Sequence, residues 1–277
     1  MDGAGNVLVA DTFNHALRKV ARNGAVSTLA GNGEAGYADG EGSAARFNQP
    51  WGITVDADGI IYVTDSGNNC VRQVGPDDVS VSTLAGDGIE GSGFANGLGL
   101  NARFDTPSGL ALDTDGHLIV ADMGNNCIRR VTTAEGCVTT VAGSAEHDRG
   151  FADGEGAAAR FNGPLDITVD GHNNILVADT KNNRIRMIAG SAACVTTVAG
   201  SAEPGNVDGK NAAASFHEPR TLAIDARGWL FVADRNPGCV RMVDASLEPP
   251  RQLLASRVLH LQVRTQARCT QSCICCR

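Results

Sequence analysis

Apolar and polar positions along residues 52–85 fall into four short segments separated by turn residues. Residues 52–56 and 70–74 alternate apolar and polar side chains, residues 60–64 are apolar, and residues 79–85 form the fourth segment. An Asp-Gly pair separates the first two segments, and Asp and Asn residues separate the second from the third, which are turn signals. The pattern predicts four antiparallel strands joined by hairpins.

The same unit recurs along the chain. In five places an aspartate that closes an apolar segment is followed seven residues later by an arginine. The spacings between these aspartates are 54, 57, 57 and 55 residues. A period this regular marks a duplicated supersecondary unit. The anchoring aspartates are Asp11, Asp65, Asp122, Asp179 and Asp234.

Four hairpin-linked strands, repeated radially, form the blade of a β-propeller. We therefore predict an all-β propeller of four-stranded antiparallel blades, with four complete blades and a partial first blade that lacks its opening strand. A β-solenoid is the alternative, but its coils usually hold only about 20–30 residues. The propeller is expected to span residues 1–243, followed by an off-pattern tail at 244–277. The blade repeats are expected near residues 5–31, 48–86, 105–143, 162–200 and 217–243.

A second motif opens each complete unit. It reads Phe-Asn-x-Pro-x-Gly at residues 47–52, with variants at 104–109, 161–164 and 216–219. With these openings and the Asn-rich turns before the third strands, the sequence over residues 6–243 resembles the NHL repeat family. The resemblance implies a six-bladed, TolB-like propeller, of which these five copies are a part. It implies little about function, because the family includes interaction modules, RNA binders and a few enzymes.

Long insertions separate the fourth strand of one unit from the first strand of the next. Because each strand reverses direction, the insertions and the Asp-containing turns are expected to emerge on one face. They hold seven of the twelve aromatic residues, so we expect them to be packed onto the blades. The insertions occupy residues 32–47, 87–104, 144–161 and 201–216.

The insertions carry net charges of −2, −1, −2 and −1. Loops at one end of a rigid scaffold commonly carry binding functions. We therefore predict that this face docks a protein partner of basic character, with a merely solvated acidic face as the alternative. The predicted binding residues are Asp39, Glu41, Glu90, Asp153, Glu155 and Asp208.

Net charge is −8 and is unevenly distributed. Residues 244–277 hold two acids against five arginines, a net of +3, which leaves −11 for the repeat region. A body this acidic is a poor match for a polyanion, so no nucleic-acid partner is expected and RNA binding is the second alternative function. No apolar run approaches the roughly 20 residues that span a membrane. No basic-then-apolar pattern typical of a signal peptide is visible ahead of the first repeat, and the compartment stays unassigned.

The repeated aspartates invite a catalytic assignment. Five identical acids in five equivalent places argue against a single active site, so we assign them to the turns as structural residues. The six histidines occupy no equivalent positions and form no metal-ligand or triad pattern. We predict no catalytic residue, no metal and no cofactor. A metal-dependent hydrolase or lyase with a site in the central channel is the first alternative.

Calcium is a minor alternative for the Asp-Gly-Glu-Gly segments at residues 39–42 and 153–156. Calcium takes six to eight oxygen ligands, and two carboxylates per loop fall short of that number. The tail ends in four closely spaced cysteines that lack a second ligand pair, which makes a poor zinc site. If five blades close without further chain, Leu253-Leu254 or Val258-Leu259 is expected to supply the last outer strand.

Overall fold

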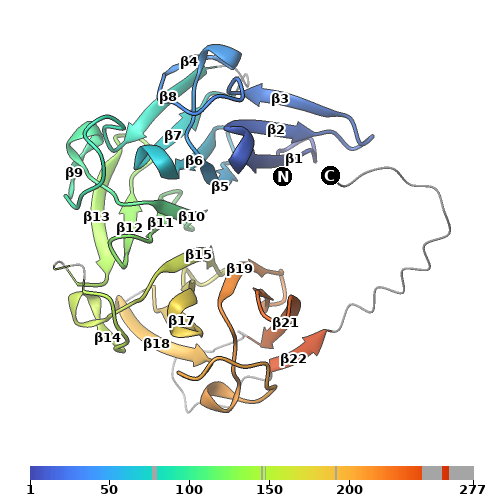
Figure 1. Ribbon diagram of the computed structural model, residues 1–277, viewed down its shortest axis with the longest axis vertical. Helices are drawn as coiled ribbons and strands as arrows, with labels where there is room; N and C mark the ends of the chain where they lie inside the picture. The colour runs from blue at the N-terminus through green and yellow to red at the C-terminus, as the bar shows by residue number, and fades with distance from the viewer. Residues whose placement is uncertain (77–79, 145, 147, 191, 245–257, 262–277) are drawn as a thin grey trace.

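The computed structural model describes residues 1–76, 80–144, 146, 148–190, 192–244 and 258–261. The described chain forms five antiparallel sheets that follow one another around a common centre (Figure 1). Short 3₁₀ turns are its helical elements. The predicted all-β propeller is therefore confirmed.

The first sheet has three strands in the order β1-β2-β3. Its strands are β1 (Val7–Asp11), β2 (Ala16–Val20) and β3 (Val26–Ala30), with the 3₁₀ turn η1 (Thr12–Asn14) between the first two. By repeat position these are the second, third and fourth strands of a blade. The expected partial first blade is confirmed.

The second, third and fourth blades each have four long strands and a two-residue strand from the preceding insertion, which pairs with the outermost strand. The second contains β4 (Gly40–Glu41), β5 (Pro50–Val55), β6 (Ile61–Asp65), β7 (Cys70–Val74) and β8 (Ser80–Ala85). The third contains β9 (Gly97–Leu98), β10 (Pro107–Leu112), β11 (Leu118–Asp122), β12 (Cys127–Val131) and β13 (Cys137–Ala142). The fourth contains β14 (Gly154–Glu155), β15 (Pro164–Val169), β16 (Ile175–Asp179), β17 (Arg184–Ile188) and β18 (Cys194–Ala199).

Single 3₁₀ turns follow a regular plan. One kind connects the second and third strands of a blade, and the other lies inside each insertion. The first kind comprises η3 (Ser66–Asn68) and η6 (Thr180–Asn182) in addition to η1. The second kind comprises η2 (Gly42–Ala44), η4 (Gly99–Asn101), η5 (Gly156–Ala158) and η7 (Asn211–Ala213).

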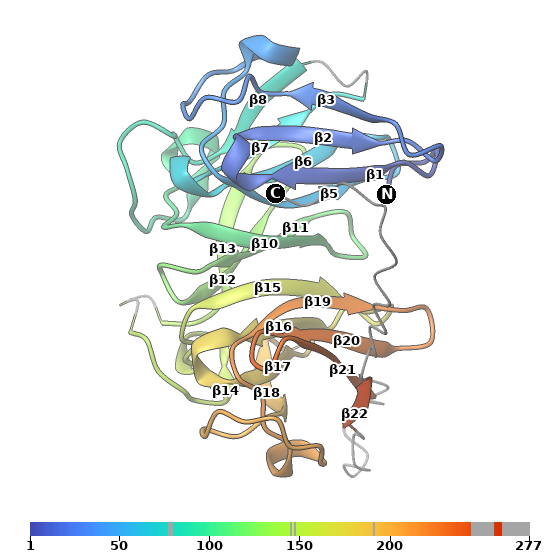
Figure 2. The same cartoon turned by 45° about the vertical axis from the view of Figure 1, so that its right-hand side comes forward.

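The last sheet has the order β19-β20-β21-β22. Its strands are β19 (Pro219–Ile224), β20 (Trp229–Asp234), β21 (Cys239–Asp244) and β22 (Val258–Leu261). Strand β22 comes from the segment that the sequence assigns to the tail, and Val258 pairs with Val243. The outer strand that we expected at Val258-Leu259 is thus present, and Figure 2 shows it at the outer edge of its sheet.

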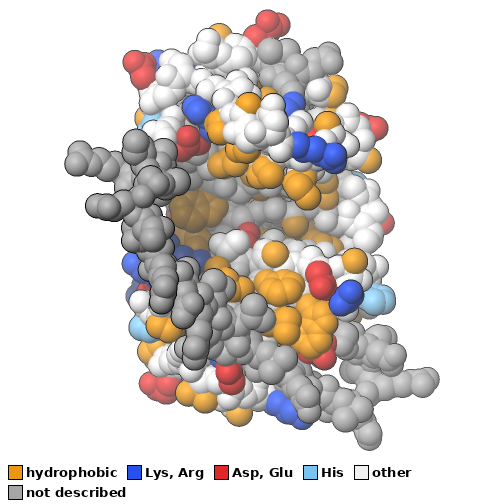
Figure 3. Space-filling model, turned by 90° about the vertical axis from the view of Figure 1, so that its right-hand side faces the viewer, with side chains coloured by type: hydrophobic (Ala, Val, Ile, Leu, Met, Phe, Trp, Pro, Cys, Tyr) orange, Lys and Arg blue, Asp and Glu red, His pale blue; other side chains and the backbone are white. Residues whose placement is uncertain are grey.

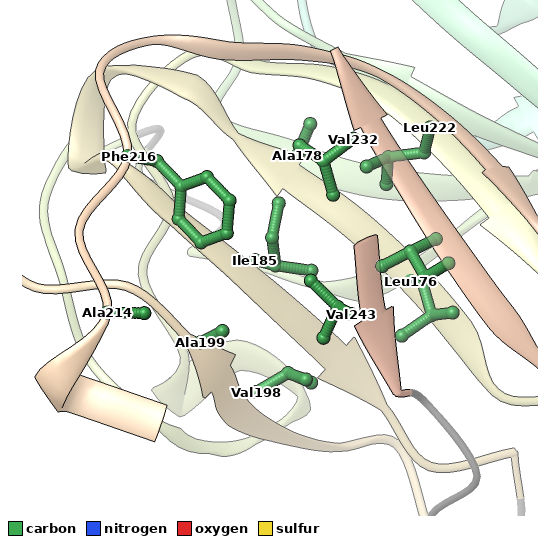
Figure 4. Packing of buried hydrophobic residues seen from close by; sticks show 11 residues of the cluster. Leu176, Ala178, Ile185, Val198, Ala199, Ala214, Phe216, Leu222, Val232 and Val243 are labelled. Carbon is green, nitrogen blue, oxygen red and sulfur yellow. The ribbon is translucent and has the colours of Figure 1, made fainter. Parts of the chain in front are cut away.

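Apolar side chains fill the spaces between successive blades. Between the fourth and fifth, Leu176, Val198 and Phe216 pack with Val232 and Val243 (Figure 4). Burial of a side chain of this size stabilises a fold by about 1.5–3 kcal/mol. Each blade therefore depends on its neighbours for a core, which is why the repeat folds only as an array.

The innermost strands pack in chain order, β5 on β10, β10 on β15 and β15 on β19, and β1, the second strand of the first blade, packs on β5. These strands lie very close together. If Gly109 of β10 carried a Cβ atom, that atom would lie only 2.3 Å from a carboxylate oxygen of Asp166 on β15. The two end sheets lie either side of the region that faces the viewer in Figure 3, where a hollow has hydrophobic side chains on its walls. Five sheets, the first without an innermost strand, agree with a partial propeller.

Candidate functional site: the insertion face

A buried arginine on the third strand of each complete blade ties that blade to the insertion that precedes it. In the second blade the Arg72 side chain is fully buried. Its Nη1 donates hydrogen bonds to the Asp65 carboxylate at 2.8 Å and to the carbonyl of Arg46 at 3.1 Å. Its Nη2 donates to the carbonyl of Ala38 at 2.8 Å and to the Asp39 carboxylate at 2.7 Å. One guanidinium therefore holds a turn acid and two points of an insertion, near residues 38 and 46.

The arrangement repeats in the next three blades. The buried arginines Arg129, Arg186 and Arg241 each bond the same set of backbone carbonyls and the turn aspartate of their own blade. The insertion supplies Asp153 to Arg186 at 2.6 Å and Asp208 to Arg241 at 2.7 Å. The arginines therefore join each blade to the insertion that leads into it from the preceding blade.

Aromatic rings from the insertions lie over these guanidinium groups. Arg72 is 5.0 Å from the ring centroid of Tyr37 and 5.1 Å from that of Phe47. Arg129 lies 4.5 Å from Phe94 and 5.2 Å from Phe104. Each cation–π contact contributes about 0.5–2 kcal/mol, more when the groups are desolvated. The prediction that the aromatic residues pack the insertions onto the blades is confirmed.

The turn aspartates lie under these arginines. Asp65 accepts hydrogen bonds from the backbone N–H of Asn48 at 2.7 Å and from the Asn68 side chain at 2.8 Å, in addition to Arg72. Burial raises the pKa of Asp65 and of Asp122 to about 6, although the neighbouring arginine acts in the opposite direction. Removing two charges from water costs several kcal/mol per ion. The close geometry of the ion pair and its additional hydrogen bonds are therefore needed to offset this cost.

The turns and the insertions do share one face. The side-chain amide of Asn68 donates to the carbonyl of Gly36 at 2.8 Å, and Asn125 and Asn182 bond Gly93 and Gly150 in the same way. The loops therefore emerge on the one face that the alternating strand directions predict.

The acids predicted to bind a partner fall into three groups. The side chains of Asp39, Asp153 and Asp208 are about half exposed, at 50, 45 and 47%, and each is ion-paired to a buried arginine. Glu90 is 71% exposed and lies 2.7 Å from Arg103. The remaining two, Glu41 and Glu155, stand exposed on the short strands β4 and β14.

Exposed apolar side chains on the same face were missed by the sequence reasoning. One insertion alone exposes three of them, and Leu98 stands where Glu41 and Glu155 stand in its neighbours. This replacement of a glutamate by a leucine was the feature of the sequence that could have predicted an exposed apolar side chain here. The exposed apolar residues of the turns and insertions are Phe13, Ile89, Leu98, Leu100, Phe151 and Val207.

Over the described ranges, no group of three or more His, Cys, Asp or Glu side chains is arranged to hold a metal ion. In the same part of the chain, no helix has the length and apolar character needed to cross a membrane.

Residues 47–74, 104–131 and 161–186 match the NHL repeat family. The chain is 30% identical over 269 residues to Protein SUPPRESSOR OF QUENCHING 1, chloroplastic, of Arabidopsis thaliana, an alignment that covers 93% of this chain and 25% of that protein. It is 32% identical over 272 residues to NHL repeat-containing protein 2 of Bos taurus, covering 86% of this chain and 37% of that protein. The chain therefore spans well under half the length of these two curated relatives.

Solved structures share the architecture. An auxiliary nutrient binding protein from Bacteroides ovatus superposes with a TM-score of 0.66 at 18% identity, covering 95% of this chain and 58% of that one. Virginiamycin B lyase from Staphylococcus aureus superposes with a TM-score of 0.60 at 15% identity, covering 95% and 69%. Identities this low establish a common fold and nothing about activity.

Proposed function

Since this chain is a β-propeller built from NHL repeats, we propose that it is a non-catalytic scaffold that binds a basic protein partner through its insertion face. Two features of the insertions together support the proposal. The insertions are held by buried arginines and phenylalanines, yet they expose carboxylates and apolar side chains to solvent.

Order in the insertions supports binding because it lowers the entropy lost when a partner docks. Phe47, Phe104, Phe161 and Phe216 are completely buried. Their insertions also carry short strands or 3₁₀ turns, and the arginine contacts fasten each of them at two points. A loop fixed in this way presents its exposed side chains in one arrangement.

The chemistry of the exposed residues indicates the partner. Leu98 and Leu100 are 54 and 55% exposed, and Ile89 is 78% exposed. Exposed apolar side chains with charged neighbours are typical of protein-binding surfaces. Glu41, Glu90 and Glu155 on the same face favour lysine and arginine on the partner, which would accelerate association and make it sensitive to salt.

Site-specific photocrosslinking tests the proposal. A benzophenone amino acid is placed at Leu98 and Leu100 on the insertion face, and at Arg227, which is exposed in the hairpin between β19 and β20 on the opposite face. We expect crosslinks to a protein of basic character from Leu98 and Leu100 only. The Glu41→Lys and Glu155→Lys variants and raised salt should weaken them, because exposed charges are screened within about 10 Å at 0.1 M salt.

Equal crosslinking from Arg227 would place the interaction elsewhere on the propeller. Crosslinks that persist unchanged in the charge-reversed variants would rule out an electrostatic contribution from this face.

A further inference from the structure

A cavity lies between the third and fourth blades, on the face opposite the insertions. Its volume is about 170 Å³. Apolar side chains form its floor, and the hairpins after β10 and β17 form its mouth. The residues that matter here are Ile119, Ile175 and Ile188 on the floor, Asp113 and Arg130 at the mouth, and Gly190 in the wall.

The blade before it shows what this space normally holds. Tyr62 stands 57 residues before Ile119, at the equivalent repeat position, and is 2% exposed. Its hydroxyl donates a hydrogen bond to the Asp56 carboxylate at 3.0 Å, and it also bonds the side chain of Thr133 in the third blade. Burial, reinforced by Asp56, raises the pKa of Tyr62 to about 12. A neutral phenol therefore fills the junction between the second and third blades.

The next junction keeps the phenol's carboxylate partner and lacks the phenol. Asp113, 57 residues after Asp56, accepts backbone N–H groups at 3.0 and 2.8 Å just as Asp56 does at 3.0 and 2.9 Å. Ile119 replaces the tyrosine ring, and Gly190 stands at the position equivalent to Thr133. Both changes remove volume from the same place, and that accounts for the cavity.

Arg130 supplies a second polar group at the mouth. Its Nη2 lies 2.7 Å from the Asp113 carboxylate and 3.1 Å from that of Asp115. A guanidinium carries five N–H donors, and these contacts use only part of them. A hydroxyl group beside Asp113 and Arg130 would donate a hydrogen bond to the Asp113 carboxylate and accept one from the Arg130 guanidinium. Both hydrogen-bonding capacities of a phenol hydroxyl would then be satisfied.

We infer that this cavity binds a small free phenol, with its ring on the isoleucine floor and its hydroxyl between Asp113 and Arg130. An apolar protein cavity of about 150 Å³ is known to hold one benzene molecule, so the observed volume accommodates a single ring. Asp113 and Asp115 disfavour an anionic ligand at the mouth, which selects the neutral phenol over an aromatic carboxylate.

Methyl-labelled protein titrated with p-cresol tests the inference. We expect saturable shifts of the Ile119, Ile175 and Ile188 methyl resonances, with a dissociation constant on the order of 0.1 mM for so small a ligand. Toluene, which lacks the hydroxyl, should bind about tenfold more weakly, the ratio expected for one buried hydrogen bond.

Three variants sharpen the test. Ile119→Tyr restores the ring that the preceding blade carries and should abolish binding while the circular dichroism spectrum is kept. Arg130→Gln introduces the residue of the preceding blade, Gln73, and should remove most of the preference for p-cresol over toluene. Val26→Tyr adds a tyrosine on exposed β3 and should bind p-cresol like the parent protein.

Several results would overturn the inference. These are no saturable p-cresol binding, shifts confined to methyl groups away from the cavity, equal affinity for toluene, or unchanged binding in a folded Ile119→Tyr protein. If Ile119→Tyr does not fold, Arg130→Gln and the methyl shifts decide. Tighter binding of a tyrosine-containing pentapeptide than of p-cresol would overturn the assignment to a free phenol.

Discussion

The guanidinium of Arg72 lies 2.7 Å from the carboxylate of Asp39, although 33 residues separate them along the chain. Arg72 belongs to the third strand of a blade and Asp39 to the insertion before that blade. The same spacing joins Arg186 to Asp153 and Arg241 to Asp208. The insertions are thus part of the folded repeat, and several consequences can be measured.

Arg129→Met should destabilise the protein by about 3–5 kcal/mol, because it leaves Asp122 buried without its cation. The free energy of unfolding from urea titration measures this loss. Arg227→Met, at an exposed hairpin position, should change it by less than about 0.5 kcal/mol. A loss of similar size in both variants would mean that the buried pair has no special role.

Asp39→Asn should cost about 1 kcal/mol or less, because Asn96 already makes the equivalent bond to Arg129 at 2.9 Å. Asp65→Ala should cost more, since it leaves both the Asn48 N–H and Arg72 short of an acceptor. Amide hydrogen exchange at Ala38 and Arg46 reports whether the insertion stays fastened. Fast exchange in Asp39→Asn would show that the insertion needs the charge and not only an oxygen acceptor.

Phe104→Ala should destabilise the fold by about 3–5 kcal/mol, because the ring is completely buried and its removal leaves a cavity. Phe13→Ala removes a ring that is 82% exposed and should cost less than about 0.5 kcal/mol. Thermal unfolding of the two variants compares an anchoring aromatic residue with a surface one. Equal effects would show that Phe13 is as important for packing as Phe104.

Asp166 should make stability depend on pH. Burial raises its pKa to about 6, while its carboxylate accepts the Leu222 N–H at 2.8 Å. The folded state therefore holds this proton more tightly than the unfolded chain, whose aspartates titrate near pH 3.9. The resulting stabilisation is complete below about pH 4 and is lost as pH rises through about 6.

Asp166→Asn removes that titration. The difference in unfolding free energy between parent and variant should shift by about 1–2 kcal/mol from pH 4 to pH 7, with the parent losing stability as pH rises. Aspartates Asp65 and Asp122 shift in the same direction in both proteins, so they cancel in the comparison. A difference that stays flat across this range would mean that Asp166 titrates normally in the folded state.

Repeat spacing and strand alternation were sufficient to predict the blades, their order and the shared face of turns and insertions. These features follow from local rules, since Asp-Gly turns and alternating apolar residues act within a few positions. The outer strand at Val258–Leu261 was weighed only as one of two candidates, because its pairing with β21 depends on chain beyond the repeat.

The sequence alone determined the repeat, in which an aspartate and an arginine recur at fixed places among short strands. Its five copies are regular enough to specify a propeller. Tertiary structure decided what those residues do. The arginines look alike along the chain, but only folding brings each one to its own insertion across 26 to 34 residues. The cavity beside Ile119 likewise exists only because two blades meet there, and the contacts between blades are set by side-chain volumes that no single repeat contains.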